Sequence, residues 1–96
     1  MIQECDYAEA TVTVGSPMGL HGRPAAQIVK RATGFKAELT VEKADGDSAS
    51  ADCRSVLALL ILAAGQGTQL ILKGEGEDAG DAVRTIADFF AGNFNE

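Results

Sequence analysis

The sequence has no tryptophan, one histidine and two cysteines, and it has no basic run and no long apolar segment. Aromatic residues make up only 5% of the 96 residues, so Ala, Val, Leu and Ile must build the core. A formal net charge of −6 without clustered Lys or Arg argues against nucleic-acid and anionic-membrane binding. The longest apolar run, Val56 to Ala64, is too short to span a bilayer. We therefore expect residues 1–96 to form one small globular domain.

The two cysteines, Cys5 and Cys53, have neither metal-ligand spacing nor the density of a disulfide scaffold. With one histidine and no Gly-rich nucleotide loop, the sequence predicts no metal site and no cofactor. The first six residues lack the basic start and apolar stretch of a signal peptide. We expect a cytoplasmic protein with free thiols, although a bridge between the cysteines remains an alternative.

The spacing of apolar residues predicts an alternation of short strands and short helices. Residues 7–14 (YAEATVTV) alternate with period two, while the apolar stripe of residues 78–90 has helical period and begins with Asp78 and Asp81 in its first turn. Asp45-Gly46 is a hairpin signal. The expected strands are 7–14, 35–43, 48–53 and 68–73, and the expected helices are 22–33, 55–64 and 78–90. This order favours an α+β fold with a mostly antiparallel sheet and helices on one face.

The histidine lies at the expected junction between the first strand and the first helix. If His21 is the helix N-cap, Pro24 falls in the first turn, where its missing N–H costs nothing. The N–H groups of Gly22 and Arg23 then point out of the helix end and, with the helix dipole and the guanidinium, form an anion site. Positive charge there disfavours the imidazolium, and a phosphoryl group on the ring would meet donors already in place. A plain cap or surface histidine remains the alternative.

The segment His21-Gly22-Arg23-Pro24-Ala25-Ala26 resembles the active-site motif of the HPr phosphocarrier family, whose usual form is His-Ala-Arg-Pro-Ala. The similarity continues through Arg54-Ser55-Val56-Leu57, Gly65-Gln66-Gly67-Thr68 and residues 76–83, and so covers nearly the whole chain in order. The resemblance implies an HPr-like open-faced β-sandwich of order β-α-β-β-α-β-α, with a four-stranded antiparallel sheet and three helices on one face.

In that family, enzyme I takes a phosphoryl group from phosphoenolpyruvate and places it on Nδ1 of the motif histidine, from which enzyme IIA components receive it. The resemblance implies that His21 is the phosphoryl acceptor, Arg23 its charge partner, and Gly22 and Arg23 the phosphate-binding residues. The chain would then be a monomeric intermediate in a sugar or nitrogen phosphotransferase system, and not a stand-alone turnover enzyme.

Ser55 matches the family's regulatory serine, which HPr kinase/phosphorylase modifies in many bacteria, and this implies a further partner. Serine is also a favoured N-cap, so a plain helix cap remains an alternative. The family's docking patch lies near the start of the second helix, and we expect its other edge on the first helix. The expected patch residues are Val56, Leu57, Leu60, Ala26, Gln27 and Lys30, with core packing as the alternative for Leu60.

Three departures from the family pattern bear on these expectations. Gly22 replaces the commoner alanine, which loosens the first turn by about 0.5–1 kcal/mol and permits a closer approach of the backbone to a phosphate. The segment 42–53 is a few residues longer than usual. Leu57 and Ala58 stand where many members have Met-Gly, which affects partner recognition, above all by an HPr kinase.

A second functional class uses the same residues differently. A regulatory binding protein of this fold would be switched by phosphorylation of Ser55 and would not need the histidine. The presence of His21 favours the phosphocarrier.

Overall fold

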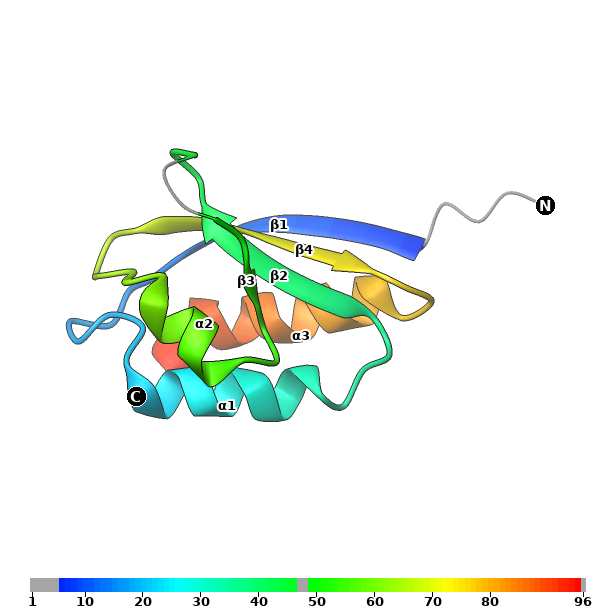
Figure 1. The fold of residues 1–96 in the computed structure, drawn as a ribbon, viewed down its shortest axis with the longest axis horizontal. Helices are drawn as coiled ribbons and strands as arrows, with labels where there is room; N and C mark the ends of the chain where they lie inside the picture. The colour runs from blue at the N-terminus through cyan, green and yellow to red at the C-terminus, as the bar shows by residue number, and fades with distance from the viewer. Residues whose placement is uncertain (1–5, 47–48, 96) are drawn as a thin grey trace.

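The computed structural model describes residues 6–46 and 49–95, which form an antiparallel sheet with helices against one of its faces (Figure 1). The elements in chain order are β1 (Tyr7–Thr13), α1 (Gly22–Ala32), β2 (Glu38–Lys43), β3 (Ala51–Asp52), α2 (Val56–Ile61), β4 (Gln69–Glu75), α3 (Ala79–Ala91) and the 3-10 turn η2 (Asn93–Asn95). The expected α+β order β-α-β-β-α-β-α is confirmed.

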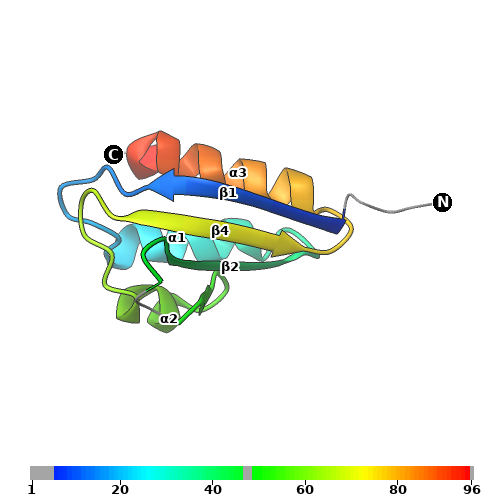
Figure 2. The same ribbon diagram turned by 90° about the horizontal axis from the view of Figure 1, so that it is seen from above.

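The four strands lie in the order β1-β4-β2-β3, and every neighbouring pair is antiparallel. The last long strand, β4, therefore lies between β1 and β2. Figure 2 shows α3 beside β1 along one edge of the molecule and α2 along the other. This arrangement places the start of α1 and the end of α3 at the same end of the sheet.

The core fills the space between the sheet and the helices. Along β4, Leu70 and Leu72 are buried while their neighbours are not, as the two-residue period of a strand requires. Ile28 of α1 and Ile86 and Phe90 of α3 meet them from the helix side, on stripes of helical period. Among the residues that the structure describes, no helix covers the opposite face of the sheet (Figure 1).

The strand expected over 35–43 begins three residues later, at Glu38. The Arg54 guanidinium donates hydrogen bonds to the carbonyl oxygens of Phe35 and Ala37, at 2.8 and 2.9 Å. Because a side chain from far along the sequence satisfies these backbone groups, this segment bends instead of joining the sheet.

Asp78 contacts the same segment from the other side. It lies at the N-cap of α3, one position before the first turn in which it was expected, and makes no side-chain cap bond. Its carboxylate accepts hydrogen bonds from the backbone N–H groups of Lys36 (2.9 Å) and Ala37 (2.7 Å). These donors, led by the N–H of Lys36, hold the pKa of Asp78 below its usual value. Asp81 does lie in the first turn of α3.

The strand expected over 48–53 is shorter than predicted. Only β3, Ala51–Asp52, pairs with β2, and Ser48 lies outside the described residues. The Asp45-Gly46 turn is present, since Gly46 has φ +78° and its N–H donates to the Lys43 carbonyl. The weak β-forming composition of this segment accounts for the short pairing.

The helix expected over 55–64 also ends early. Ser55 is its N-cap, as predicted, because its hydroxyl accepts the Ala58 N–H at 3.1 Å. The regular helix stops at Ile61, and Ala63 has the left-handed φ of +56°. The remaining expected ranges, 7–14, 22–33, 68–73 and 78–90, agree with β1, α1, β4 and α3 to within two residues at each end.

Candidate functional site

His21 lies at the N-cap of α1, where its carbonyl accepts the first helical hydrogen bond from Ala25 N–H at 3.0 Å. Its backbone is extended, with φ −101° and ψ −171°, and its imidazole makes no cap bond to the helix. The side chain is half-buried. The predicted cap position is therefore confirmed, and the ring is not used to cap the helix.

Two backbone donors remain at this helix end. The first four N–H positions of a helix, counted from the N-cap, have no acceptor within the helix. Here the N–H of His21 donates to the Gly19 carbonyl at 3.1 Å and Pro24 has no N–H, so those of Gly22 and Arg23 remain. No acidic residue occupies the first turn. The helix end thus presents positive charge and donors beside the imidazole.

Gly22 is exposed, and a Cβ added there would have no atom within 4 Å. Packing therefore does not require glycine after the histidine, and the family's usual alanine would fit. Gly19 is different, because its φ is +70° and an added Cβ would lie 2.7 Å from the Ala64 carbonyl oxygen. The next residue, Leu20, donates its N–H to that same oxygen at 2.8 Å. This close approach fixes the loop that carries His21 against the segment that follows α2.

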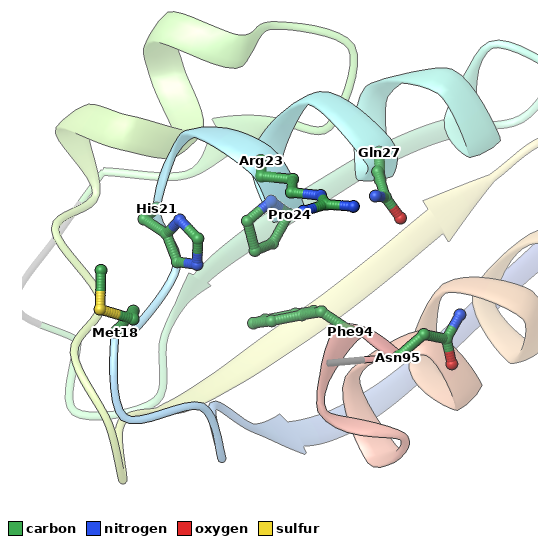
Figure 3. Close-up of a pocket in the computed structure, with 7 residues that line it drawn as sticks. All are labelled: Met18, His21, Arg23, Pro24, Gln27, Phe94 and Asn95. Atoms are coloured by element: carbon green, nitrogen blue, oxygen red, sulfur yellow. The ribbon is translucent and has the colours of Figure 1, made fainter.

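The imidazole borders a pocket of about 430 Å³ (Figure 3). Arg23 and Gln27 line it from α1, and in Figure 3 the guanidinium extends toward the Gln27 end. The complete lining is Met18, His21, Arg23, Pro24, Gln27, Phe94 and Asn95. Sequence reasoning found His21, Arg23 and Gln27 but missed the two C-terminal residues, because no local pattern shows that the chain end returns to this helix.

The expected docking residues lie on two neighbouring helices, α1 and α2, and one of them, Gln27, lines the pocket. Leu57 of α2 is 68% exposed and Leu60 is 40% exposed, so core packing does not account for them, whereas Leu59 between them is fully buried. Ile61 (71%) and Met18 (72%) are also exposed and were not predicted. On α1, Ala26 and Lys30 are exposed and Gln27 is half-buried. Val56 of α2 is also half-buried.

Other reactive groups are held away from the pocket. Cys53 is buried and free, and its burial raises the pKa of its thiol to about 12, so it stays protonated. The other cysteine, Cys5, lies outside the described residues. The Arg54 guanidinium is engaged by two carbonyl oxygens of the segment before β2. Within 6–46 and 49–95, no three His, Cys, Asp or Glu side chains are grouped so as to hold a metal ion.

No helix in the described part of the chain is both long enough and apolar enough to cross a membrane.

Known proteins share this fold and are similar in sequence along most of the chain. The family model described as the HPr component phosphorylation site of the phosphotransferase system matches residues 8–92. The chain is 39% identical to the phosphocarrier protein HPr of Lysinibacillus sphaericus over 75 residues, covering 78% of this chain and 82% of that one. It is 33% identical over 91 residues to the multiphosphoryl transfer protein of Salmonella typhimurium, covering 95% of this chain but only 24% of the length of that relative.

The solved structures agree. The crystal structure of an HPr from Thermoanaerobacter tengcongensis superposes with a TM-score of 0.85 at 31% identity, covering 93% of this chain and 97% of that one. Crh of Bacillus subtilis, whose crystal structure is described as a domain-swapped dimer, superposes with a TM-score of 0.70 at 30% identity, covering 97% of each chain. The chain therefore belongs to the HPr family of phosphocarrier proteins, and its fold is the open-faced β-sandwich of that family. Membership supports a role in a phosphotransferase system.

Proposed function

We propose that His21 carries a phosphoryl group between enzyme I and the enzyme IIA components of a sugar or nitrogen phosphotransferase system in the cytoplasm. The observation that carries this proposal is the position of the imidazole, beside two backbone donors and Arg23 at the mouth of a pocket. A ring nitrogen attacks the phosphorus, a new P–N bond forms, and the donor's bond to phosphorus breaks. In the onward transfer, a nucleophile of the acceptor protein attacks the phosphorus, the P–N bond breaks and the imidazole of His21 is the leaving group.

The local charges suit a group that must be held and then released. The phosphoryl oxygens would meet the N–H groups of Gly22 and Arg23 and the Arg23 guanidinium. Each dipole-scale contact contributes about 0.3–1 kcal/mol, and a hydrogen bond to a charged group about 1.5–3 kcal/mol. Contacts of this size favour binding of the phosphoryl group without making its transfer prohibitively slow.

The surface around the pocket supports transient contact with larger proteins. Leu57, Leu60 and Val56 on α2 supply an apolar area, and Ala26, Gln27 and Lys30 on α1 border it. Apolar side chains that folding leaves exposed beside a reactive group are typical of a docking surface.

The test is phosphorylation of the purified chain by its cognate enzyme I and phosphoenolpyruvate. We expect the wild type to gain one acid-labile, base-stable phosphoryl group and His21→Ala to gain none. Gln27→Ala is the control, since it changes the same pocket but keeps the imidazole. As a residue at the border of the docking surface it should raise the KM of enzyme I for the protein, but it should still gain one phosphoryl group when the reaction is complete. A wild type that gains nothing, or a His21→Ala variant that gains as much, would overturn the proposal.

Phosphorylation of Ser55 by an HPr kinase/phosphorylase would be a second, regulatory function. Its hydroxyl is half-buried and caps α2, directly before the exposed apolar residues of that helix. A phosphate at this cap would add negative charge at the edge of the docking surface. The capping bond by itself accounts for a serine here, so the carrier function is the one that the geometry supports best.

A further inference from the structure

The C-terminal turn η2 has an unusual backbone. Asn93, Phe94 and Asn95 have φ values of 54°, 58° and 60°, which is the left-handed region. That region is disfavoured for side chains with a Cβ, and a bulky residue such as Phe94 is a clear outlier there. Three such residues in succession persist only where surrounding contacts hold them.

Contacts from two directions hold η2 in place. The Phe94 ring packs on Phe89 and Phe90 of α3, with ring centroids 5.4 and 5.1 Å apart, and is 3% exposed. On the other side, an added Cβ at Gly15 would clash with Asn93 Oδ1, so the turn lies directly against the loop that leads to His21. The left-handed turn η2 is thus held both by α3 and by the loop that leads to His21.

This anchoring places an aromatic ring in the wall of the His21 pocket. Phe94 lines the pocket together with His21 and Pro24, although it lies more than seventy positions further along the chain. Figure 3 shows the ring extending from η2 toward the His21 end, on the side of the pocket opposite α1. Polar groups of α1 therefore line one side of the pocket, and the Phe94 ring forms the apolar part of the other side, next to Asn95.

We propose that Phe94 is a positioning residue for His21: its ring, held by the left-handed turn η2, limits the orientations of the imidazole and excludes water from one side of the phosphohistidine. This inference rests on the proposed function of His21. During hydrolysis, water attacks the phosphorus, the P–N bond breaks, inorganic phosphate leaves and the ring nitrogen takes a proton. An apolar wall reduces the directions from which water can reach the phosphorus.

Phe89 offers a matched control. It is 4% exposed and belongs to the same aromatic cluster, but it does not line the pocket and instead packs under the Arg31 guanidinium. Phe94→Leu and Phe89→Leu therefore remove similar buried rings from one cluster, and only the first changes the wall beside His21. Thermal unfolding of both variants establishes that each is folded at the assay temperature.

The experiment phosphorylates wild type and both variants, removes enzyme I and follows release of inorganic phosphate at neutral pH. We expect Phe94→Leu to hydrolyse about tenfold faster than wild type, and Phe89→Leu to stay within about twofold. With enzyme I present, Phe94→Leu should lower kcat while KM stays near the wild-type value, because the exposed residues of α2 are unchanged.

Equal hydrolysis rates for Phe94→Leu and wild type would overturn the inference but leave the carrier function intact. So would an equal acceleration in Phe89→Leu, since general loosening of the aromatic cluster would then explain both. A wild type that accepts no phosphoryl group would overturn the proposed function and this inference with it.

Discussion

The open face of the sheet and the exposed side of α2 both face solvent, but they are built from different residues. On the sheet, solvent-facing positions of β1 and β2 are mainly polar, as at Glu9, Thr11 and Glu38. On α2, the most exposed positions are Leu57 and Ile61, at 68% and 71%. The sheet follows the pattern that folding alone requires, and α2 does not.

Charge divides the molecule in the same way. The net charge of the chain is −6, yet two of its segments, 10–37 and 53–74, contain no Asp or Glu. These segments include α1, α2 and the loop that leads to His21. The acidic residues of the described chain lie on the remaining segments, among them the open-face residues Glu9 and Glu38. The two helices α1 and α2 therefore carry basic and apolar side chains but no acidic ones. Folding does not demand this combination, whereas binding of an anionic group and a protein partner does.

The largest effect should separate buried from exposed leucines on the same helix. Leu59→Ala removes a fully buried side chain and should destabilise the protein by about 2–5 kcal/mol. Leu57→Ala should change the free energy of unfolding by less than about 0.5 kcal/mol but raise the KM of enzyme I for the protein about tenfold. Urea unfolding and steady-state kinetics measure the two quantities. A large loss of stability in Leu57→Ala would mean that folding, and not docking, explains its presence.

The next effect should separate two exposed arginines. Arg23→Ala removes a guanidinium from the His21 pocket. It should raise the free energy of the phosphoryl-transfer transition state by about 1.5–3 kcal/mol, the size of one hydrogen bond to a charged group, and so lower kcat/KM by roughly 10- to 150-fold. Arg84→Ala is the control, because this arginine pairs with Asp81 on the exposed surface of α3 at 3.1 Å. It should transfer at the wild-type rate. An equal loss of kcat/KM in both variants would indicate that phosphoryl transfer depends only on the overall charge of the protein and not on the position of Arg23.

Ser55 should have a smaller effect, on the stability of α2. Ser55→Ala loses the capping bond to Ala58 N–H and should cost about 0.5–2 kcal/mol. Ser55→Asp keeps an acceptor that suits an N-cap, so it should retain most of the stability and serves as the control. Denaturant unfolding of the three proteins tests this. If Ser55→Ala is as stable as wild type, the exposed helix does not depend on its cap.

The smallest effect concerns the side away from the pocket and depends on pH. Because hydrogen bonds from Lys36 and Ala37 lower the pKa of Asp78, its carboxylate stabilises the fold above the pKa of the unfolded chain, roughly 3.9. That contribution is lost as the pH falls through the folded-state pKa. Asp78→Asn should therefore lower Tm at neutral pH and flatten its fall on acidification.

Asp81→Asn is the control for this prediction, since it removes an exposed carboxylate from the same end of α3. It should leave the acid limb of the Tm profile close to that of wild type. A wild-type profile in Asp78→Asn would show that the carboxylate does not stabilise the segment before β2.

The local sequence predicted most of the elements and the centre of the site because both depend on neighbouring residues. The position of His21 at the N-cap follows from Pro24 three residues later, and β1 follows from strict alternation. The late start of β2 could not be predicted locally, because the segment before it is held by hydrogen bonds to Arg54 and Asp78, which lie far along the chain. The C-terminal wall of the pocket was equally hidden, since nothing local predicts a left-handed Phe94.

The most direct test of the central claim is to locate the phosphoryl group on the protein. After reaction with enzyme I and phosphoenolpyruvate, tryptic digestion at neutral to basic pH and mass spectrometry should place one phosphoryl group on His21. The fragment that contains Ser55 should carry none. A phosphoryl group on any other residue, or none at all with the cognate enzyme I, would contradict the account.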